Sequence, residues 1–596
     1  MRTRLTKLRF RFRRRVRKGR RQVEDLGAQA EENIERHLFR RFERLLPIRR
    51  FLFGWLGLVV VLIGALVAQN LSLSNYYQTS RTIPGGIFNE GVRGRFTNAN
   101  PLYATSDADA TVSRLVFAGL FTYNQQGKLV GDLASGYSVD TKGTTYTVRL
   151  KPHLTWQDGR PLTSRDVVFT YQLIQNPDAQ SPLESSWRGI SVTAPDARTV
   201  VFKLPDGLAS FPYNLTNGIV PRHLLAGIPP PDLRSADFNT VHPVGAGPFT
   251  WQAVTVSDNG NPDKTGEQIA LTPFDGYQGG APKLQKFVVQ VFATEDQLTK
   301  AFKSNKLTAA AGFTSPPKTL LKDHSVMQHS LLLRAANMVF FKTSSGVLAD
   351  KQVRQALVQA ANVPAIIAKL GYSTHAVREP LLTGQLGYDR SLTQAGFDLT
   401  AARKLLDTDG WVTGKDGWRS KGGQPLTFSL SASNTPENRS VAHELQQQWR
   451  ELGANVRVQS QDAADFQSTV AYHNYDAVLY GISIGPDPDV FVYWDSSQAD
   501  IRSANRLNLS EWKNPVADVS LEAGRTRRDP LLRTIKYKPF LQAWQQDAPA
   551  LGLYQPRLLY LTNGPVHGLT RSSINTPPDR LANVQNWEIR QGKVTD

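Results

Sequence analysis

The 596-residue chain contains no cysteine. It therefore forms no disulfide bond, and it cannot carry a lipid on an N-terminal cysteine. Disulfides are needed mainly by small secreted domains, whereas a chain of this length buries enough apolar surface to fold without them. The absence of cysteine is thus compatible with a protein that works outside the cytoplasm.

Familiar metal-ligand patterns are also missing. The 10 histidines are scattered and form no HExxH motif, since His443-Glu444 has no second histidine at the required spacing. Asp107-x-Asp109 lacks the glycine and the closing glutamate of a calcium-binding loop. We therefore expect no metal, no other cofactor and no catalytic activity.

Charged residues are absent between residues 51 and 80. About 20 helical residues span the hydrocarbon core of a bilayer, so the apolar residues 51–71 are predicted to form one transmembrane helix. Residues 1–50 carry 18 Lys and Arg against 6 Asp and Glu, a net charge of +12. The positive-inside rule places this basic arm in the cytoplasm and the rest of the chain outside the membrane. A cleaved signal peptide is the alternative, but residues 65–68 make a poor cleavage site.

The basic arm permits two interpretations. Apolar residues recur at three- and four-residue steps from Val23 to Leu45, a pattern typical of an amphipathic helix lying on anionic lipid. The arm is equally compatible with a solvated segment that only fixes the membrane orientation. Nucleic-acid binding is not expected, because the basic stretch has no accompanying fold and adjoins a membrane helix.

Beyond the apolar run, strands alternate with helices of ten or more residues, as in α/β proteins. Residues 163–166 have the spacing of a capping box and predict a helix over residues 167–174. Further helices are predicted over residues 350–370 and 437–452, and the second should end at Gly453.

The stretch from Tyr475 to Gln498 has the pattern of a binding loop. Residues 477–480 form an apolar run that predicts a buried strand, and a loop rich in glycine and proline follows. Asp487 and Asp489 lie in this loop, with aromatic residues directly after them. Free backbone groups, apolar walls and fixed charge suit a small polar ligand. Each aspartate is equally compatible with ordinary turn chemistry.

The same stretch contains a G-x-S-x-G sequence centred on Ser483, the pattern of the nucleophile elbow of α/β-hydrolases. That elbow requires a helix directly after the serine. Pro486 and Pro488 prevent a helix from starting there in the required form. His567 follows Ser483 in the sequence, so an aspartate followed by a histidine, the order that these hydrolases use, remains possible. The sequence therefore argues against a serine hydrolase.

Three motifs point to one protein family. Residues 154–174 match the pattern W-x-D-G-x-P-[LF]-T-x-x-D-V-x-[FY] at nearly every position, residues 244–249 read VGAGPF, and residues 487–491 read DPDVF. These motifs closely resemble those of the extracellular solute-binding proteins that deliver peptides, nickel or sugar-like solutes to ABC importers. In peptide-binding members an aspartate pairs with the peptide's amino terminus, and Gly485 or Pro486 occupies its position here.

The resemblance extends over about residues 83–596. It implies an α/β, two-lobed ectodomain like the periplasmic binding proteins (type II, the large peptide-binding class). Residues 83–290 would form lobe I, to which residues 562–596 return, and residues 291–561 would form lobe II. The two crossings between these segments would act as the hinge. Residues 72–82 would link the transmembrane helix to lobe I.

The resemblance also implies that the two lobes close on a ligand held largely through its main chain. Asp487 is predicted to receive a ligand amine in place of the missing aspartate, and Trp187 and Trp494 to form apolar walls. The other predicted ligand-binding residues are Thr105, Ser106, Asp107, Tyr480, Ile482, Ser483 and Gly485.

The predicted function is the capture of oligopeptides or dipeptides and their delivery to the permease subunits of an ABC importer. The protein would be a membrane-anchored monomer with an extracellular or periplasmic binding domain. Alternative ligands are an oligosaccharide or a metal chelate. A surface sensor or an adhesion protein on the same scaffold is the alternative of another class.

Overall fold

The computed structural model describes residues 49–257, 266–314, 317, 319–320, 323–503, 506–569 and 573–595. The predicted basic arm lies outside these residues except for its last two. The chain divides into two compact units, of which one holds the residues before Thr82 and after Arg590, and the other is Thr82–Arg590.

Helix α3 (Arg49–Tyr77) makes up most of the first unit, together with a two-stranded sheet of β1 (Gln78–Ile83) and β24 (Arg590–Thr595). Its segment Phe53–Asn70 has a mean hydropathy of 1.9 and is not buried by the described chain, so by length and composition it is able to cross a membrane. The predicted linker at residues 72–82 is helix and strand instead. No glycine or proline interrupts this part of the chain, so nothing local stops the helix.

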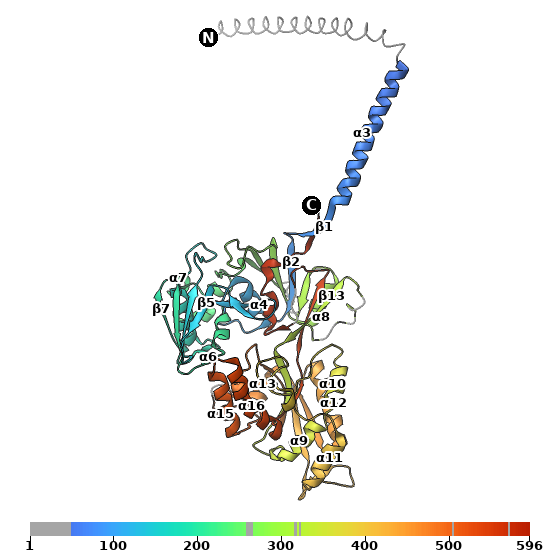
Figure 1. Ribbon diagram of the computed structural model, residues 1–596. Helices are drawn as coiled ribbons and strands as arrows, with labels where there is room; N and C mark the ends of the chain where they lie inside the picture. The colour runs from blue at the N-terminus through green and yellow to red at the C-terminus, as the bar shows by residue number, and fades with distance from the viewer. Residues whose placement is uncertain are drawn as a thin grey trace, which may run out of the picture. The chain divides into compact units, whose positions relative to one another are not determined.

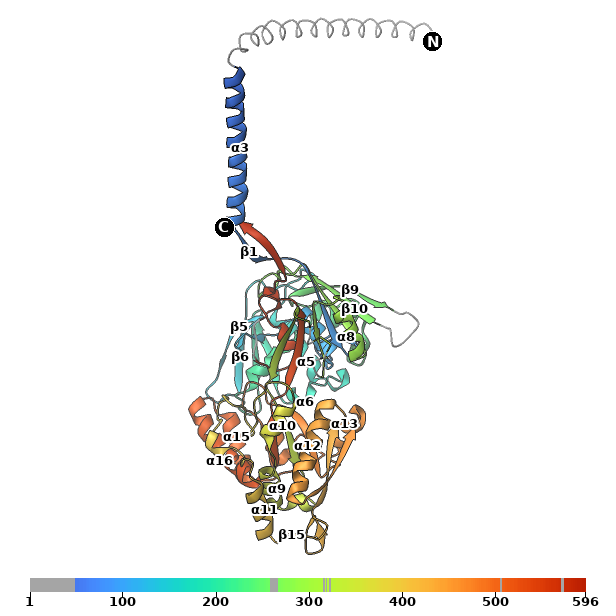
Figure 2. The ribbon, with the colours of Figure 1, turned by 90° about the vertical axis from the view of Figure 1, so that its right-hand side faces the viewer.

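Two lobes make up the second unit (Figures 1 and 2). Lobe I is built on an eight-stranded sheet of order β23-β13-β22-β12-β2-β11-β10-β9. In it β2 runs parallel to both β11 and β12, and β22 runs antiparallel to β12 and β13. The strands are β2 (Ile87–Arg93), β9 (Phe249–Ser257), β10 (Gly266–Pro273), β11 (Lys286–Phe292), β12 (Ala309–Ala311), β13 (Val326–Leu333), β22 (Arg557–Asn563) and β23 (Ser573–Ile574).

A four-stranded antiparallel sheet of order β5-β6-β8-β7 and the hairpin β3–β4 complete lobe I. These strands are β3 (Phe121–Tyr123), β4 (Leu129–Gly131), β5 (Ala134–Val139), β6 (Thr145–Leu150), β7 (Ser191–Asp196) and β8 (Thr199–Lys203). The α-helices are α4 (Asp107–Val116), α5 (Ser164–Gln175), α6 (Glu184–Trp187), α7 (Arg222–Leu225) and α8 (Glu295–Lys303). Short 3₁₀ helices occur at Pro177–Ala179, Phe211–Thr216, Pro230–Ser235, Asp237–Asn239, Pro577–Leu581 and Val584–Asn586.

Lobe II is built on a five-stranded sheet of order β19-β18-β20-β14-β21, with a small sheet of order β15-β16-β17 beside it. The strands are β14 (Ala335–Phe341), β15 (Val412–Thr413), β16 (Arg419–Lys421), β17 (Gln424–Pro425), β18 (Thr427–Ser433), β19 (Asn455–Gln461), β20 (Ala477–Ser483) and β21 (Ala550–Tyr554). The α-helices are α9 (Lys351–Gln359), α10 (Val363–Lys369), α11 (Leu399–Thr408), α12 (Pro436–Leu452), α13 (Ala463–Ala471), α14 (Phe491–Trp494), α15 (Pro515–Thr526) and α16 (Pro530–Asp547). The 3₁₀ helices are Val347–Ala349, Arg390–Leu392 and Ser496–Gln498.

Both faces of the lobe II sheet are buried. Along β14, Val339 and Phe341 pack into one apolar core and Met338 and Phe340 into another, because successive side chains of a strand point to opposite faces. Helices α9 to α12 contribute buried residues to the first core, and α13 to α16 contribute to the second. The result is a sheet covered by helices on both sides, as the alternation of strands and helices predicts.

Local signals set several helix ends. The capping box forms as predicted: the Thr163 N–H donates to the Asp166 carboxylate at 2.8 Å at the start of α5. Helix α12 ends at Gly453, whose φ of 92° is accessible to glycine with little strain. The predicted helix over residues 350–370 is wrong in one respect, since it divides into α9 and α10. Asn362 caps α10 and Pro364 lies in its first turn, so a new helix starts there.

The chain crosses between the lobes in two adjacent segments. The first joins β13 to β14 at Arg334, and the second joins β21 to β22 through Gln555 and Pro556. The two are bonded to each other, since the Leu333 N–H donates to the Pro556 carbonyl at 2.9 Å. Strands β12, β13 and β22 therefore belong to the lobe I sheet, although the boundaries drawn from the sequence assign β12, β13 and residues 557–561 of β22 to lobe II.

Candidate functional site

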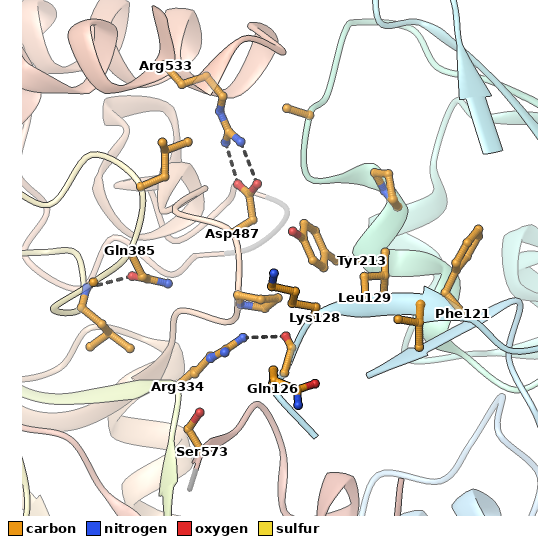
Figure 3. A pocket seen from close by; sticks show the side chains of 18 of the residues that line it. Phe121, Gln126, Lys128, Leu129, Tyr213, Arg334, Gln385, Asp487, Arg533 and Ser573 are labelled. Atoms are coloured by element: carbon orange, nitrogen blue, oxygen red, sulfur yellow. Dashed lines mark hydrogen bonds and ion pairs between the residues drawn. The ribbon is translucent and has the colours of Figure 1, made fainter. Parts of the chain in front are cut away.

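A cavity of about 1230 Å³ lies between the two lobes. Its walls come from segments far apart in the sequence (Figure 3). Lobe I contributes Phe121, residues 126–131, Tyr137, Tyr146, Pro212 and Tyr213. Lobe II contributes His375, residues 382–386, Pro486, Asp487, Arg528 and Arg533. Arg334 and Gln555 of the crossing segments also line it.

The β3–β4 hairpin forms part of the lobe I wall. The Asn124 side chain accepts hydrogen bonds from the Gln126 and Lys128 N–H groups, at 3.1 and 2.9 Å, and Gly127 adopts a φ of 71°. Asn and Gly both favour such a turn. It directs residues 128–131 along the cavity, and within the described chain β4 pairs with β3 alone. The other edge of β4 is therefore left without a partner strand.

The lobe II wall contains the loop after β20. Both carboxylate oxygens of Asp487 accept hydrogen bonds from the Arg533 guanidinium, at 2.7 and 2.8 Å (Figure 3). The two side chains are 9% and 7% exposed. Burial alone lowers the pKa of Arg533, but the Asp487 carboxylate outweighs it and the pKa is raised above its ordinary value. The charge of Asp487 is thus already neutralised within the protein.

Asp489 connects the lobes. Its carboxylate accepts a hydrogen bond from the Ser210 hydroxyl of lobe I at 2.9 Å and pairs with Arg525 of lobe II at 3.2 Å. The Ala209 N–H donates to the Arg525 carbonyl at 2.9 Å, and Arg528 donates to the Asp140 carbonyl at 3.0 Å. These contacts and the crossing segments hold the lobes together at separate places.

Tyrosines and cations are among the other polar side chains that line the cavity. Burial raises the pKa of Tyr146 to about 12, and burial together with the Asp487 charge raises the pKa of Tyr213. Both phenols are therefore neutral at physiological pH. Lys128, Arg334 and Arg528 also line the cavity.

A family model described as bacterial extracellular solute-binding proteins, family 5, matches residues 128–503. The chain belongs to this family. The oligopeptide-binding protein AppA of Bacillus subtilis is 25% identical over 485 residues, which are 79% of this chain and 86% of AppA.

Solved structures of family 5 fold similarly. The structure of Bacillus subtilis AppA in complex with a nonapeptide has a TM-score of 0.69 and 23% identity, with 86% of this chain and all of AppA covered. The structure of NikZ from Campylobacter jejuni in complex with Ni(L-His) has a TM-score of 0.71 and 23% identity, with 84% and 99% covered. At these identities the likeness concerns the fold, which is the two-lobed α/β fold predicted from the motifs.

The sequence predicts that Asp487 receives a ligand amine in place of the missing aspartate, and the structure shows another partner for this carboxylate. Asp487 lines the cavity, but its oxygens are engaged by Arg533 rather than open to a ligand. Gly485 adjoins the cavity through its carbonyl, which accepts a hydrogen bond from Gln385 at 2.8 Å. The turn at Gly485 has a φ of 73°, as an open glycine turn requires.

The two predicted tryptophan walls are core residues. Trp187 is 2% exposed and stacks on Tyr171 with ring centroids 4.0 Å apart. Trp494 is fully buried and stacks on Phe340 at 5.6 Å. Neither is among the cavity-lining residues, because each packs within the apolar core of its own lobe.

The other predicted residues also lie outside the cavity wall. Ser106 caps α4 by accepting a hydrogen bond from the Asp109 N–H, and Thr105 and Asp107 flank this cap. In β20, Tyr480 and Ile482 pack on the core beneath α13 to α16. The Ser483 carbonyl accepts a hydrogen bond from the Tyr493 hydroxyl. These residues belong to a helix cap and to a largely buried strand. The sequence alone does not distinguish such structural residues from residues that contact a ligand.

The G-x-S-x-G sequence does not form a nucleophile elbow in the described structure. Strand β20 runs through Ser483, and the next helix, α14, begins only at Phe491. The backbone geometry that a hydrolase requires directly after its serine is therefore not present at this position.

Sequence reasoning missed the cavity cations Lys128, Arg334, Arg528 and Arg533. Lys128 and Arg334 are 206 residues apart in the sequence, and Arg334 and Arg528 are 194 residues apart. None of the four belongs to a recognisable motif. The one available signal is indirect, since Lys128 directly follows the turn-favouring residues Asn124 and Gly127.

Proposed function

We propose that this protein captures peptides in the cavity between its lobes and delivers them to an ABC importer, as a membrane-anchored extracellular or periplasmic binding protein. The observation that carries the proposal is the cavity itself, in a chain of family 5. Its volume of about 1230 Å³ exceeds the roughly 300–1,000 Å³ that is usual for small-molecule sites. A ligand several residues long is compatible with such a space.

The unpaired edge of β4 offers a way to hold a peptide. An extended peptide adds to a free strand edge through main-chain hydrogen bonds, which are indifferent to side chains. Residues 128–131 lie along the cavity and have one partner strand in the described chain. The relative AppA is named an oligopeptide-binding protein, and its solved structure holds a nonapeptide, which supports the same ligand class here.

Opening of the lobes would admit and release the ligand, and closure would hold it. We place the hinge at the crossing segments around Arg334 and around Gln555–Pro556, because they are the two places where the chain passes between the sheets. The closed surface would then dock on the permease. Helix α3 would anchor the protein in the membrane, with the basic arm on the cytoplasmic side.

Native mass spectrometry of the full chain, released from detergent micelles without prior denaturation, tests the ligand class. The proposal predicts bound masses that differ by amino-acid residues, since main-chain recognition retains a mixture of peptides. One discrete non-peptide mass would contradict the peptide proposal and move the ligand to another solute.

A further inference from the structure

The charges that line the cavity are strongly unbalanced. Four lining side chains are cationic, Lys128, Arg334, Arg528 and Arg533, and the one acidic lining side chain is Asp487. Asp487 and Arg533 neutralise each other through two short hydrogen bonds. Three positive charges therefore face the cavity without an internal counterion.

The contacts of these three cations confirm that they have no acidic partner among the described residues. Arg334 donates to the Gly127 carbonyl at 3.2 Å and to the Asn575 side-chain oxygen at 3.5 Å, and Arg528 donates to the Asp140 carbonyl. All of these acceptors are neutral. The Lys128 ammonium has no hydrogen-bond or ion-pair partner in the described chain, and its side chain lies between Tyr213 and Arg334 in the view of Figure 3.

The three cations come from different parts of the fold. Lys128 belongs to lobe I, Arg528 to the α15–α16 connection of lobe II, and Arg334 to a crossing segment. Closure of the lobes brings like charges around one partly enclosed space, where water screens them less than at an open surface. A ligand carboxylate would relieve this repulsion and form charge-assisted hydrogen bonds with the guanidinium or ammonium groups.

We infer that the cavity selects ligands with a net negative charge, and that its preferred peptides carry acidic side chains. The inference rests on the proposed function, since it concerns the same cavity. One terminal carboxylate would balance one of the three cations, so further carboxylates must come from side chains. A ligand amine, in contrast, finds no unengaged carboxylate among the lining residues.

Equilibrium binding to the full chain in detergent tests the inference with matched probes. The peptides Ala-Glu-Ala-Glu-Ala, Ala-Gln-Ala-Gln-Ala and Ala-Lys-Ala-Lys-Ala share length and backbone and differ in charge. Citrate supplies carboxylates without peptide bonds. We expect the Glu peptide to bind about tenfold or more tightly than the Gln peptide, with a preference that shrinks as salt is added.

Variants that remove one positive charge test how much each cation contributes to binding. Lys128→Gln should weaken binding of the Glu peptide about tenfold and binding of the Gln peptide less, because the Gln peptide has only its terminal carboxylate to pair with a cation. Arg528→Gln is a second variant with an exposed side chain and should act in the same direction. Lys300→Gln, at an exposed position of α8 that does not line the cavity, is the matched control and should change neither affinity.

The outcomes distinguish this inference from the proposed function. Equal affinities for the three peptides would overturn the charge preference and leave peptide capture intact. Tight binding of citrate with no peptide bound would support an anionic ligand and overturn peptide capture. Failure of both Lys128→Gln and Arg528→Gln to weaken the Glu peptide would overturn the role of the cations.

Discussion

Asp487 shows why one side chain in a binding loop has to be judged by its neighbours. Its position in a DPD motif suggests an open carboxylate, but a bidentate contact with Arg533 fills both of its oxygens. Arg533 in turn donates to the Gly524 carbonyl at 2.9 Å, so the pair fixes the β20 loop to the α15–α16 hairpin. The role of Asp487 is therefore to shape the cavity wall.

Asp487→Asn should lower the free energy of unfolding by about 3 kcal/mol, because it leaves the Arg533 charge buried without its partner. Chemical denaturation followed by tryptophan fluorescence measures this. Glu184→Gln removes the exposed pair of Glu184 with Arg188 and serves as the control, with a loss within about 0.5 kcal/mol. A stability of Asp487→Asn equal to that of the control would contradict the structural role.

Glu379 should make the stability of the protein depend on pH. Its side chain is fully buried, one oxygen accepts the Asp389 N–H at 3.2 Å and the other has no partner in the described chain. Burial raises its pKa from 4.5 to about 8. Between these values the unfolded chain has lost the proton and the folded chain keeps it, so Glu379 makes the protein less stable as pH rises from about 5 to about 8.

Glu379→Gln should remove that part of the pH dependence. The variant should gain stability relative to the wild type as pH rises, and most at pH 8, since the amide needs no proton to stay neutral. Unfolding curves of both proteins at pH 5, 6.5 and 8 measure the difference. A stability difference that is constant over this range would show that the Glu379 carboxyl titrates normally in the folded protein.

At the scale of elements, the loop of Asp489 is a contact between lobes. The Ser210 hydroxyl donates to its carboxylate from the other lobe. A hydrogen bond to a charged group contributes about 1.5–3 kcal/mol, so its loss should favour the open arrangement.

Ser210→Ala should accordingly accelerate ligand dissociation about tenfold, with a smaller effect on association. Stopped-flow release of a bound fluorescent peptide measures the rate. Ser135→Ala is a matched control, because that hydroxyl donates to the Arg149 carbonyl within lobe I. Equal dissociation rates in the two variants would show that the Ser210 contact does not hold the lobes closed.

Elements were predictable where the signal is local. The capping box at Thr163–Asp166, the end of α12 at Gly453 and the strand at the start of β20 each follow from a few adjacent residues. The split between α9 and α10 was missed although Pro364 signals it. The cavity was not predictable, because Lys128, Arg334 and Arg528 meet only through the folding of both lobes.

At the scale of the whole molecule, charge and hydropathy divide the chain. Most of its net charge of +19 precedes α3, which is the one helix of the described chain that is long and apolar enough to cross a membrane. The family motifs all lie after it. The sequence therefore predicted the family and the two-lobed fold, while the crossing positions required the structure, since β12, β13 and β22 pair with strands far away in the sequence.

Cell fractionation tests whether residues 51–71 anchor the chain in the membrane. The full chain should stay with membranes after alkaline carbonate extraction, and deletion of residues 51–71 should release it. An epitope tag at the C-terminus, detected by immunoblotting, shows in which fraction each protein is found. A soluble wild-type product that lacks residues 1–68 would show that the apolar segment is a cleaved signal peptide.

Hydrogen–deuterium exchange of the full chain, with and without Ala-Glu-Ala-Glu-Ala, tests the central claim that a solute binds between the lobes. Ligand addition should slow exchange in residues 128–131 of lobe I and in residues 382–386 of lobe II together, because both line the cavity. Binding that slows exchange in neither segment, or only at a surface away from both, would contradict it.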